Sequence, residues 1–288
     1  MPHASYPANS VIACVDGSKQ QPTVLEAASW AASQLVCSIG LLHAHDSTGS
    51  GVAADFSGSL SVKARESLLN KLSQADAKSA RELNEHGWSI LESAKNQLKS
   101  ASTAQSFSLH WHQNLERSLS QLQADTALVV LGQNGADNQG KKIGQQVESA
   151  IKACDRPLML TTPKFTAPKR ALLAFDNRSG SKEALDWISR YPLLFHTEIQ
   201  ILMVADVNPK NESTVREAVC ILKQNGRKAT GKVVSGKVIP TLASTLAQDF
   251  DTLIMGAYGH SAIREWALGS NTRELLQLNP GSCLCFRA

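Results

Sequence analysis

The sequence predicts an α/β protein made of two tandem copies of one domain, each a five-stranded parallel sheet with helices on both faces. Two observations support this prediction. Short apolar segments rich in Val, Ile and Leu alternate with amphipathic segments along the chain. Such alternation is typical of a parallel sheet whose strands are joined by right-handed helical crossovers. Several of the apolar segments also recur, in the same order, in the second half of the chain.

The repeat is clearest in four pairs of apolar segments. Those in the first half are 11–16, 40–43, 127–132 and 157–160, and their counterparts are 171–176, 200–203, 251–256 and 282–285. These segments lack a clean two-residue alternation, so we expect strands that are buried on both faces of a sheet. The second copy is shorter, and the missing length falls between its second and fourth strands.

Helices are predicted between the strands. Residues 21–34 and 181–191 carry apolar side chains three or four residues apart, which is the spacing of one helix face. Residues 62–98 form a long, mostly helical region without proline, where the first copy carries its extra length. The join, 161–169, has two prolines and no periodicity, as expected of a linker. We therefore expect domains over 1–163 and 168–288.

Composition excludes several classes of protein. With 42% hydrophobic and 19% charged residues, the chain is not typical of a disordered protein. The net charge of +4 is small and the charges are interspersed, which gives no reason to expect nucleic acid or an anionic membrane as a partner. No apolar run approaches the ~20 residues that span a bilayer, and residues 1–10 lack the layout of a signal peptide. We expect a cytoplasmic protein.

The six cysteines are too sparse for a disulfide scaffold. Most fall in or beside apolar segments, so we expect small buried hydrophobes in a reducing compartment. Cys283 and Cys285 lack the spacing of a metal-binding pair.

The most informative segment follows the fourth strand of the second copy. Gly256 ends a strand, Gly259 and Gly269 follow, and Ser270 opens the next predicted helix in the pattern G-x2-G-x9-G-S. Glycines let backbone approach an anion closely. A helix N-terminus adds unpaired N–H groups and the positive end of a dipole. The segment therefore predicts a phosphate-binding loop.

This loop resembles the nucleotide-binding motif of the universal stress proteins, and the whole chain resembles a tandem member of that family. The acidic residues after the first strand of each copy, Asp16 and Asp176, fit the resemblance. It implies the strand order 3-2-1-4-5 in each copy. The first and fourth strands are then neighbours at the switch point where ligands bind in such sheets.

The resemblance also assigns a nucleotide site to the second copy. Asp176 would contact the ribose or adenine, and Val204 would offer backbone to adenine. The ribose and phosphates would be held by Gly256, Gly259, Gly269, Ser270 and the adjacent Asn271. The ligand implied is ATP, or AMP or ADP, and Mg²⁺ would arrive with the nucleotide because the sequence shows no dedicated metal cage.

The first copy departs from this pattern. Asp16 is kept, but the loop reads Gly132, Gly135, then Gly144 and Gln145, one residue short and with Gln in place of Ser. Gln145 is bulkier and would occupy phosphate space, whereas Lys141 and Lys142 could attract an anion or lie in solvent. We expect weak or no ATP binding in this copy.

Two histidine pairs stand on expected strands of the first copy: His43 with His45, and His110 with His112. Residues two apart on a strand point the same way. No third ligand is evident beside either pair, so we expect polar residues at strand ends and no metal site. If both pairs faced one crevice they could form a site, which the sequence alone does not decide.

Three functions fit these observations. The first is a nucleotide-dependent stress or signalling factor that holds ATP or AMP in the second copy. The second is a slow ATP hydrolase, for which Arg264 and His260 are the available groups and which would be at most a weak ATPase. The third is an interaction module whose first copy, with the Gly- and Ser-rich segment 46–61, binds a protein or a non-nucleotide ligand. The two copies can pair within one chain, and a further homodimer is compatible with this arrangement.

Overall fold

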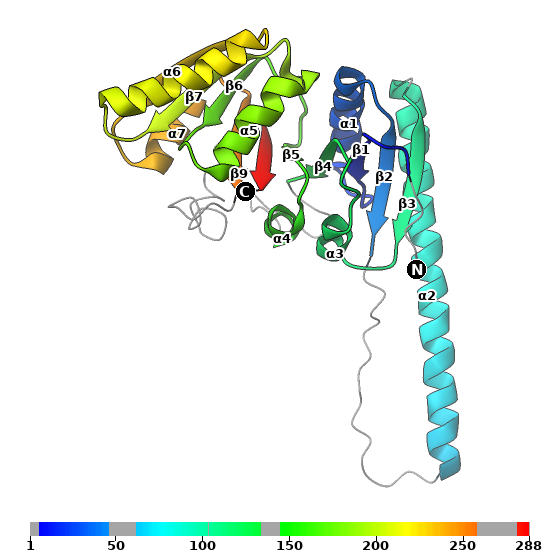
Figure 1. The fold of residues 1–288 in the computed structure, drawn as a ribbon. Coiled ribbons are helices and arrows are strands. Elements are labelled where there is room, and N and C mark those ends of the chain that lie inside the picture. The colour runs from blue at the N-terminus through cyan, green and yellow to red at the C-terminus, as the bar shows by residue number, and fades with distance from the viewer. Residues whose placement is uncertain (1–5, 46–61, 103, 134–144, 258–280, 288) are drawn as a thin grey trace.

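A computed structural model describes residues 6–45, 62–102, 104–133, 145–257 and 281–287 of the 288-residue chain. In these residues ten strands form one sheet, and helices cover both of its faces (Figure 1). The predicted α/β class is confirmed.

The first half of the chain supplies five of the strands. Local sequence explains several helix ends. Pro22 lies in the first turn of the first helix, which ends at Val36 with a left-handed φ of 52°. Asn114 caps the third helix by accepting the N–H of Arg117 at 2.9 Å. In chain order the elements are β1 (Val11–Cys14), α1 (Gln21–Leu35), β2 (Ile39–Ala44), α2 (Val62–Ala101), β3 (Ser106–Trp111), α3 (Leu115–Ser120), β4 (Leu128–Gly132), α4 (Gln145–Ala153) and β5 (Leu158–Thr161).

The second half supplies the other five strands. Its elements are β6 (Arg170–Ala174), α5 (Ser179–Arg190), the 3₁₀ turn η1 (Pro192–Leu194), β7 (Glu198–Val204), α6 (Pro209–Gln224), β8 (Lys228–Val234), α7 (Val238–Leu246), β9 (Thr252–Ala257) and β10 (Ser282–Arg287). Helix α6 begins at a proline preceded by Asn208, whose side chain accepts the N–H of Asn211 at 2.9 Å. Both residues favour a helix start at this point.

Each half has the strand order 3-2-1-4-5. The order is β3-β2-β1-β4-β5 in the first half and β8-β7-β6-β9-β10 in the second, and all neighbours within a half are parallel. The first and fourth strands of each half are therefore adjacent, which creates a switch point where the chain leaves neighbouring strands in opposite directions. This arrangement confirms the strand order implied by the resemblance.

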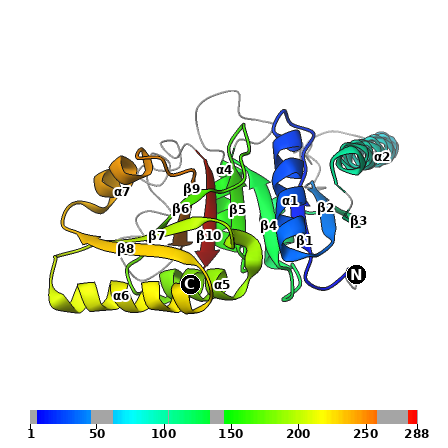
Figure 2. The ribbon, with the colours of Figure 1, turned by 90° about the horizontal axis from the view of Figure 1, so that it is seen from above.

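The two halves do not form separate sheets. Strand β10 pairs with β5 in the antiparallel sense, with Leu284 opposite Met159 and Cys283 opposite Leu160 (Figure 2). The expectation of two separate five-stranded sheets is therefore corrected to one mixed sheet of ten strands. The physical reason is that the last strand of each half would otherwise expose a row of unpaired backbone N–H and C=O groups.

The inner strands are buried on both faces, as their lack of alternation predicts, whereas the edge strands β3 and β8 are partly exposed. In β1, the neighbouring residues Ile12 and Ala13 are both fully buried but belong to opposite faces of the sheet. One face packs against α1, α2, α5 and α6, and the other against α3, α4 and α7. The core thus runs across both halves.

Helix α2 matches the long helical region predicted over 62–98. Its last part packs on the sheet through Leu91, Ala94 and Leu98, all nearly fully buried. The rest of the helix extends well beyond the strands (Figure 1). Among the described helices, none has both the length and the apolar character needed to cross a bilayer.

Two glycines allow a test of how tightly the strands are covered. A Cβ atom at Gly256 would lie 2.5 Å from the carbonyl carbon of Gly180, whereas one at Gly40 would meet the side-chain atoms Ile12 Cδ1 and Phe107 Cζ, each at 2.7 Å. Backbone moves less readily than a side-chain end. We therefore expect Gly256→Ala to destabilise the protein by about 1–3 kcal/mol, and Gly40→Ala by less.

Thermal unfolding followed by circular dichroism measures both variants. A larger loss of midpoint temperature in Gly40→Ala than in Gly256→Ala would contradict this account of the packing.

Candidate functional site

The first strand of the second half ends in a turn built around Asp176. Its Oδ1 accepts the N–H of Arg178 at 3.1 Å and the hydroxyl of Ser181 at 2.7 Å. Asn177, which lies between Asp176 and Arg178 in the sequence, has a left-handed φ of 62°. The carboxylate thus fixes the path of the chain from β6 into α5.

The same turn recurs in the first half. Asp16 follows β1, and its Oδ1 accepts the N–H of Ser18 at 2.9 Å. Gly17 lies between them with a φ of 73°, where a side chain would be strained. The aspartates found by the internal repeat are therefore equivalent in structure as well as in sequence.

A pocket of about 410 Å³ opens where β6 and β7 end. Asp176 and Val204, two of the predicted site residues, both line it. Helix α6 adds the polar side chains of Lys210, Asn211 and Thr214, whereas Leu202 and the α7 residues Val238 and Leu242 make the opposite side apolar. This size and this division between apolar and polar walls are typical of small-molecule sites.

Gly256 lies on the strand next to this pocket. Its neighbour Met255 in β9 pairs with Ala174 at the end of β6. A Cβ atom at Gly256 would lie 2.5 Å from the carbonyl carbon of Gly180, so the first turn of α5 packs closely on Gly256. Val204 and Gly256 lie near the ends of β7 and β9, and Asp176 lies in the turn that follows β6 between them.

The remaining predicted residues of the second-half site lie outside the described residues. They are Gly259, Gly269, Ser270 and Asn271. The same holds for His260 and Arg264, which the hydrolase alternative requires.

The corresponding region of the first half is only partly described. Gly132 ends β4, and a Cβ atom there would lie 2.6 Å from Oε1 of Gln20. Gly135, Gly144, Lys141 and Lys142 lie outside the described residues, as does the segment 46–61. Gln145 is the first residue of α4.

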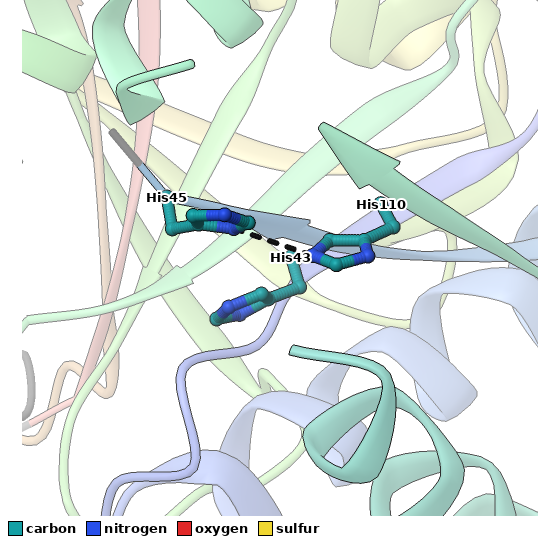
Figure 3. Close-up of side chains that lie close together, drawn as sticks. All are labelled: His43, His45 and His110. Carbon is teal, nitrogen blue, oxygen red and sulfur yellow. Dashed lines mark hydrogen bonds between the residues drawn. The ribbon is translucent and has the colours of Figure 1, made fainter. Parts of the chain in front are cut away.

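The structure brings the two histidine pairs of the first half together. His43 on β2 and His110 on β3 are partners in the strand register, and His45 and His112 follow each by two residues. One ring nitrogen from each of His43, His45 and His110 lies within 4.8 Å of the others (Figure 3). The sequence does not reveal a third candidate ligand for His43 and His45. In the structure, His110 on the neighbouring strand β3 supplies it.

Hydrogen bonds link the members of this histidine cluster, which we define as His43, His45, His110 and His112. Nε2 of His110 lies 3.2 Å from Nδ1 of His45, and Nε2 of His45 lies 3.2 Å from Nδ1 of His112. Nδ1 of His43 lies 2.9 Å from the carbonyl oxygen of Val15. Burial, followed by the nearby rings of His112, His45 and His43, lowers the pKa of His110 to about 4. Its imidazole is neutral at pH 7.

The cysteines are mostly buried, as expected, with one correction. Cys14, Cys154, Cys283 and Cys285 are buried, and Cys37 is half-buried. Burial raises the pKa of the Cys154 thiol to about 11, so it is uncharged at pH 7. Cys220 is exposed on α6, contrary to the expectation, because α6 covers the sheet through Val215, Ala218 and Leu222.

The sequence and the fold of the chain both resemble those of known proteins. No protein-family profile matches the chain. The chain is 25% identical to the universal stress protein Slr1230 of Synechocystis, over 96% of this chain and 99% of that protein. A crystal structure of a universal stress protein from Archaeoglobus fulgidus matches with a TM-score of 0.70 at 16% identity, covering 98% of this chain and 99% of that one. Over nearly its whole length, the chain is similar to universal stress proteins in sequence and in fold.

Both matches extend over nearly the full length of the two chains compared. A universal stress protein solved in complex with cAMP is matched over 42% of this chain and 98% of that one, at 20% identity and a TM-score of 0.36.

The Asp176 turn generates a prediction about stability. Asp176→Ala removes the acceptor of the Arg178 N–H and the Ser181 hydroxyl, so we expect a loss of about 1–2 kcal/mol in the free energy of unfolding. Asp176→Asn keeps an oxygen acceptor and should lose less. Urea denaturation followed by tryptophan fluorescence measures both variants. Equal losses in the two variants would show that the turn does not depend on this acceptor.

Proposed function

We propose that this protein acts as a universal stress protein, a nucleotide-dependent stress or signalling factor that binds ATP or AMP in its second half. The observation that carries the proposal is the pocket at the ends of β6 and β7, beside β9. Two residues chosen from the sequence for a nucleotide site, Asp176 and Val204, line this pocket, and a third, Gly256, lies on the adjoining strand.

The chemistry of the pocket walls suits a nucleotide. A base would lie against the apolar wall formed by Val204, Val238 and Leu242. Asp176 can accept hydrogen bonds from ribose hydroxyls, because an ionised carboxylate has acceptor capacity beyond the two contacts described above. Lys210 supplies positive charge within the same pocket, whereas the charge of Arg178 is paired with Asp176 at 4.0 Å. Positive charge favours an anionic ligand.

The phosphates would extend toward the glycine-rich segment that begins at Gly256. Close packing against Gly180 leaves no room for a side chain at position 256. Glycine is expected at the point where a strand ends and a phosphate-binding loop begins, because it allows close approach of the backbone. Mg²⁺ would arrive as a companion of ATP and be held through the phosphate oxygens.

Binding is tested by titration calorimetry of ATP–Mg²⁺ and of AMP into the full chain after bound nucleotide has been removed. We expect one site per chain. Gly269→Val should abolish binding because the side chain would occupy the space of the phosphates. Asp176→Ala should weaken binding by about tenfold or more, since a hydrogen bond to a charged group contributes roughly 1.5–3 kcal/mol.

The internal repeat supplies matched controls. Gly144→Val and Asp16→Ala make the same changes at the equivalent positions of the first half and should leave the stoichiometry and affinity unchanged. No binding to the unmodified protein would refute the proposal. Loss of binding in the first-half variants alone would move the site to the other half.

A further inference from the structure

The histidine cluster is the feature of the first half that nucleotide binding does not explain. It contains four of the eight histidines in the chain. The rings lie close to one another, with centroids 5.0 Å apart for His45 and His110 and 4.7 Å apart for His110 and His112. We propose that His43, His45 and His110 bind one divalent transition-metal ion, and that His112 holds His45 in the orientation needed to bind it.

The distances between ring nitrogens are close to those of a metal site. Two ligands on a tetrahedral Zn²⁺ with bonds of roughly 2.0–2.1 Å lie about 3.4 Å apart. Nδ1 of His45 and Nε2 of His110 are already 3.2 Å apart. The three candidate nitrogens lie within 4.8 Å of one another, so rotation of the imidazole rings can complete the triangle without a change in the strands.

Hydrogen bonds outside the triangle set the tautomers that metal binding needs at His43 and His45. Nδ1 of His43 donates its proton to the carbonyl oxygen of Val15, which leaves a lone pair on Nε2. When His45 binds through Nδ1, its Nε2 carries the proton and donates to Nδ1 of His112. Metal-binding histidines are usually oriented by such a partner on the second ring nitrogen.

The backbone around the cluster is rigid and closely fitted. His43 and His110 stand opposite each other on paired strands, so their Cα positions are fixed by the sheet. Helix α2 covers the cluster at Gly87, where a Cβ atom would lie only 2.3 Å from Nε2 of His110. The ring of Trp88 meets His110 edge-on, with centroids 5.1 Å apart. A side chain at position 87 would therefore collide with the ligating atom, and glycine avoids this collision.

The position of the cluster gives an ion access from solvent. His43 is buried, His45 and His110 are half-buried, and His112 is exposed. Donor chemistry indicates the kind of ion, because imidazoles favour Zn²⁺, Cu²⁺ or Ni²⁺ over Mg²⁺ and Ca²⁺. Three protein ligands also leave a fourth position for water or another ligand. This site lies in the half opposite the proposed nucleotide pocket and does not depend on it.

The test uses the full chain without a polyhistidine tag, stripped of metal by a chelator and then titrated with Co²⁺ and with Zn²⁺. We expect one ion per chain. Bound Co²⁺ should show the visible absorption of a low-coordinate site, and added Zn²⁺ should displace the Co²⁺ and remove this absorption. His45→Ala and His110→Ala should each abolish this binding. His112→Ala should weaken it by about 10–100-fold, as expected for an orienting partner.

Two other histidines serve as matched controls. His86 is exposed on α2 next to Gly87, and His196 is exposed in the second half. His86→Ala and His196→Ala should bind the ion as the unmodified protein does. Circular dichroism confirms that each variant is folded, and Zn²⁺ should raise the unfolding temperature of the unmodified protein but not of His45→Ala.

Three results would overturn the proposal. They are the absence of stoichiometric binding, full binding retained by a His45→Ala/His110→Ala double variant, and an equal loss in the two control variants. Asp176→Ala should bind Co²⁺ normally, so failure of nucleotide binding and failure of metal binding are separate outcomes.

Discussion

The antiparallel pairing of β5 with β10 is the interaction on which the rest of the structure depends. It covers the open edge of each half with the edge of the other and makes one sheet from two repeats. The two remaining edges are β3 and β8, and β8 carries the exposed charges of Lys228 and Lys232, which discourage further strand pairing. A homodimer of this protein would therefore have to use a surface other than β5 and β10.

Each half places its chemistry at the ends of the same strands, but with different residues. His43 in the first half corresponds to Met203 in the second. The second half forms an open pocket with a carboxylate, a lysine and an apolar wall. The first half has imidazoles and the cover of α2. The two halves share the strand order and the Asp turns, and they differ in the side chains beyond the turns.

Much of this fold was accessible from the sequence because apolar segments and their repetition fix the class, and the aspartates mark the ends of the first strands. The pairing of β5 with β10 was not accessible from the sequence. Residues 157–160 and 282–285 would be equally apolar in a central strand of one sheet and in an edge strand that pairs with the other half. The histidine cluster depends on the register between β2 and β3, and its members His45 and His110 lie 65 residues apart in the sequence. Two His-x-His motifs at the ends of neighbouring strands were the available signal. The exposure of Cys220 depends on the rotation of α6, which its apolar spacing indicates only loosely.

Helix α2 gives the contact between Gly87 and His110 a mechanical consequence. The helix starts at Val62, so some 25 residues precede that contact, and at a rise of about 1.5 Å per residue they form an arm of roughly 37 Å. A tilt of about 10° with its fulcrum at Gly87 would move the far end by roughly 6 Å. A small change in the direction of α2 at Gly87 is thus multiplied along the arm, so that the far end of the helix moves much more than the residues that pack on the sheet.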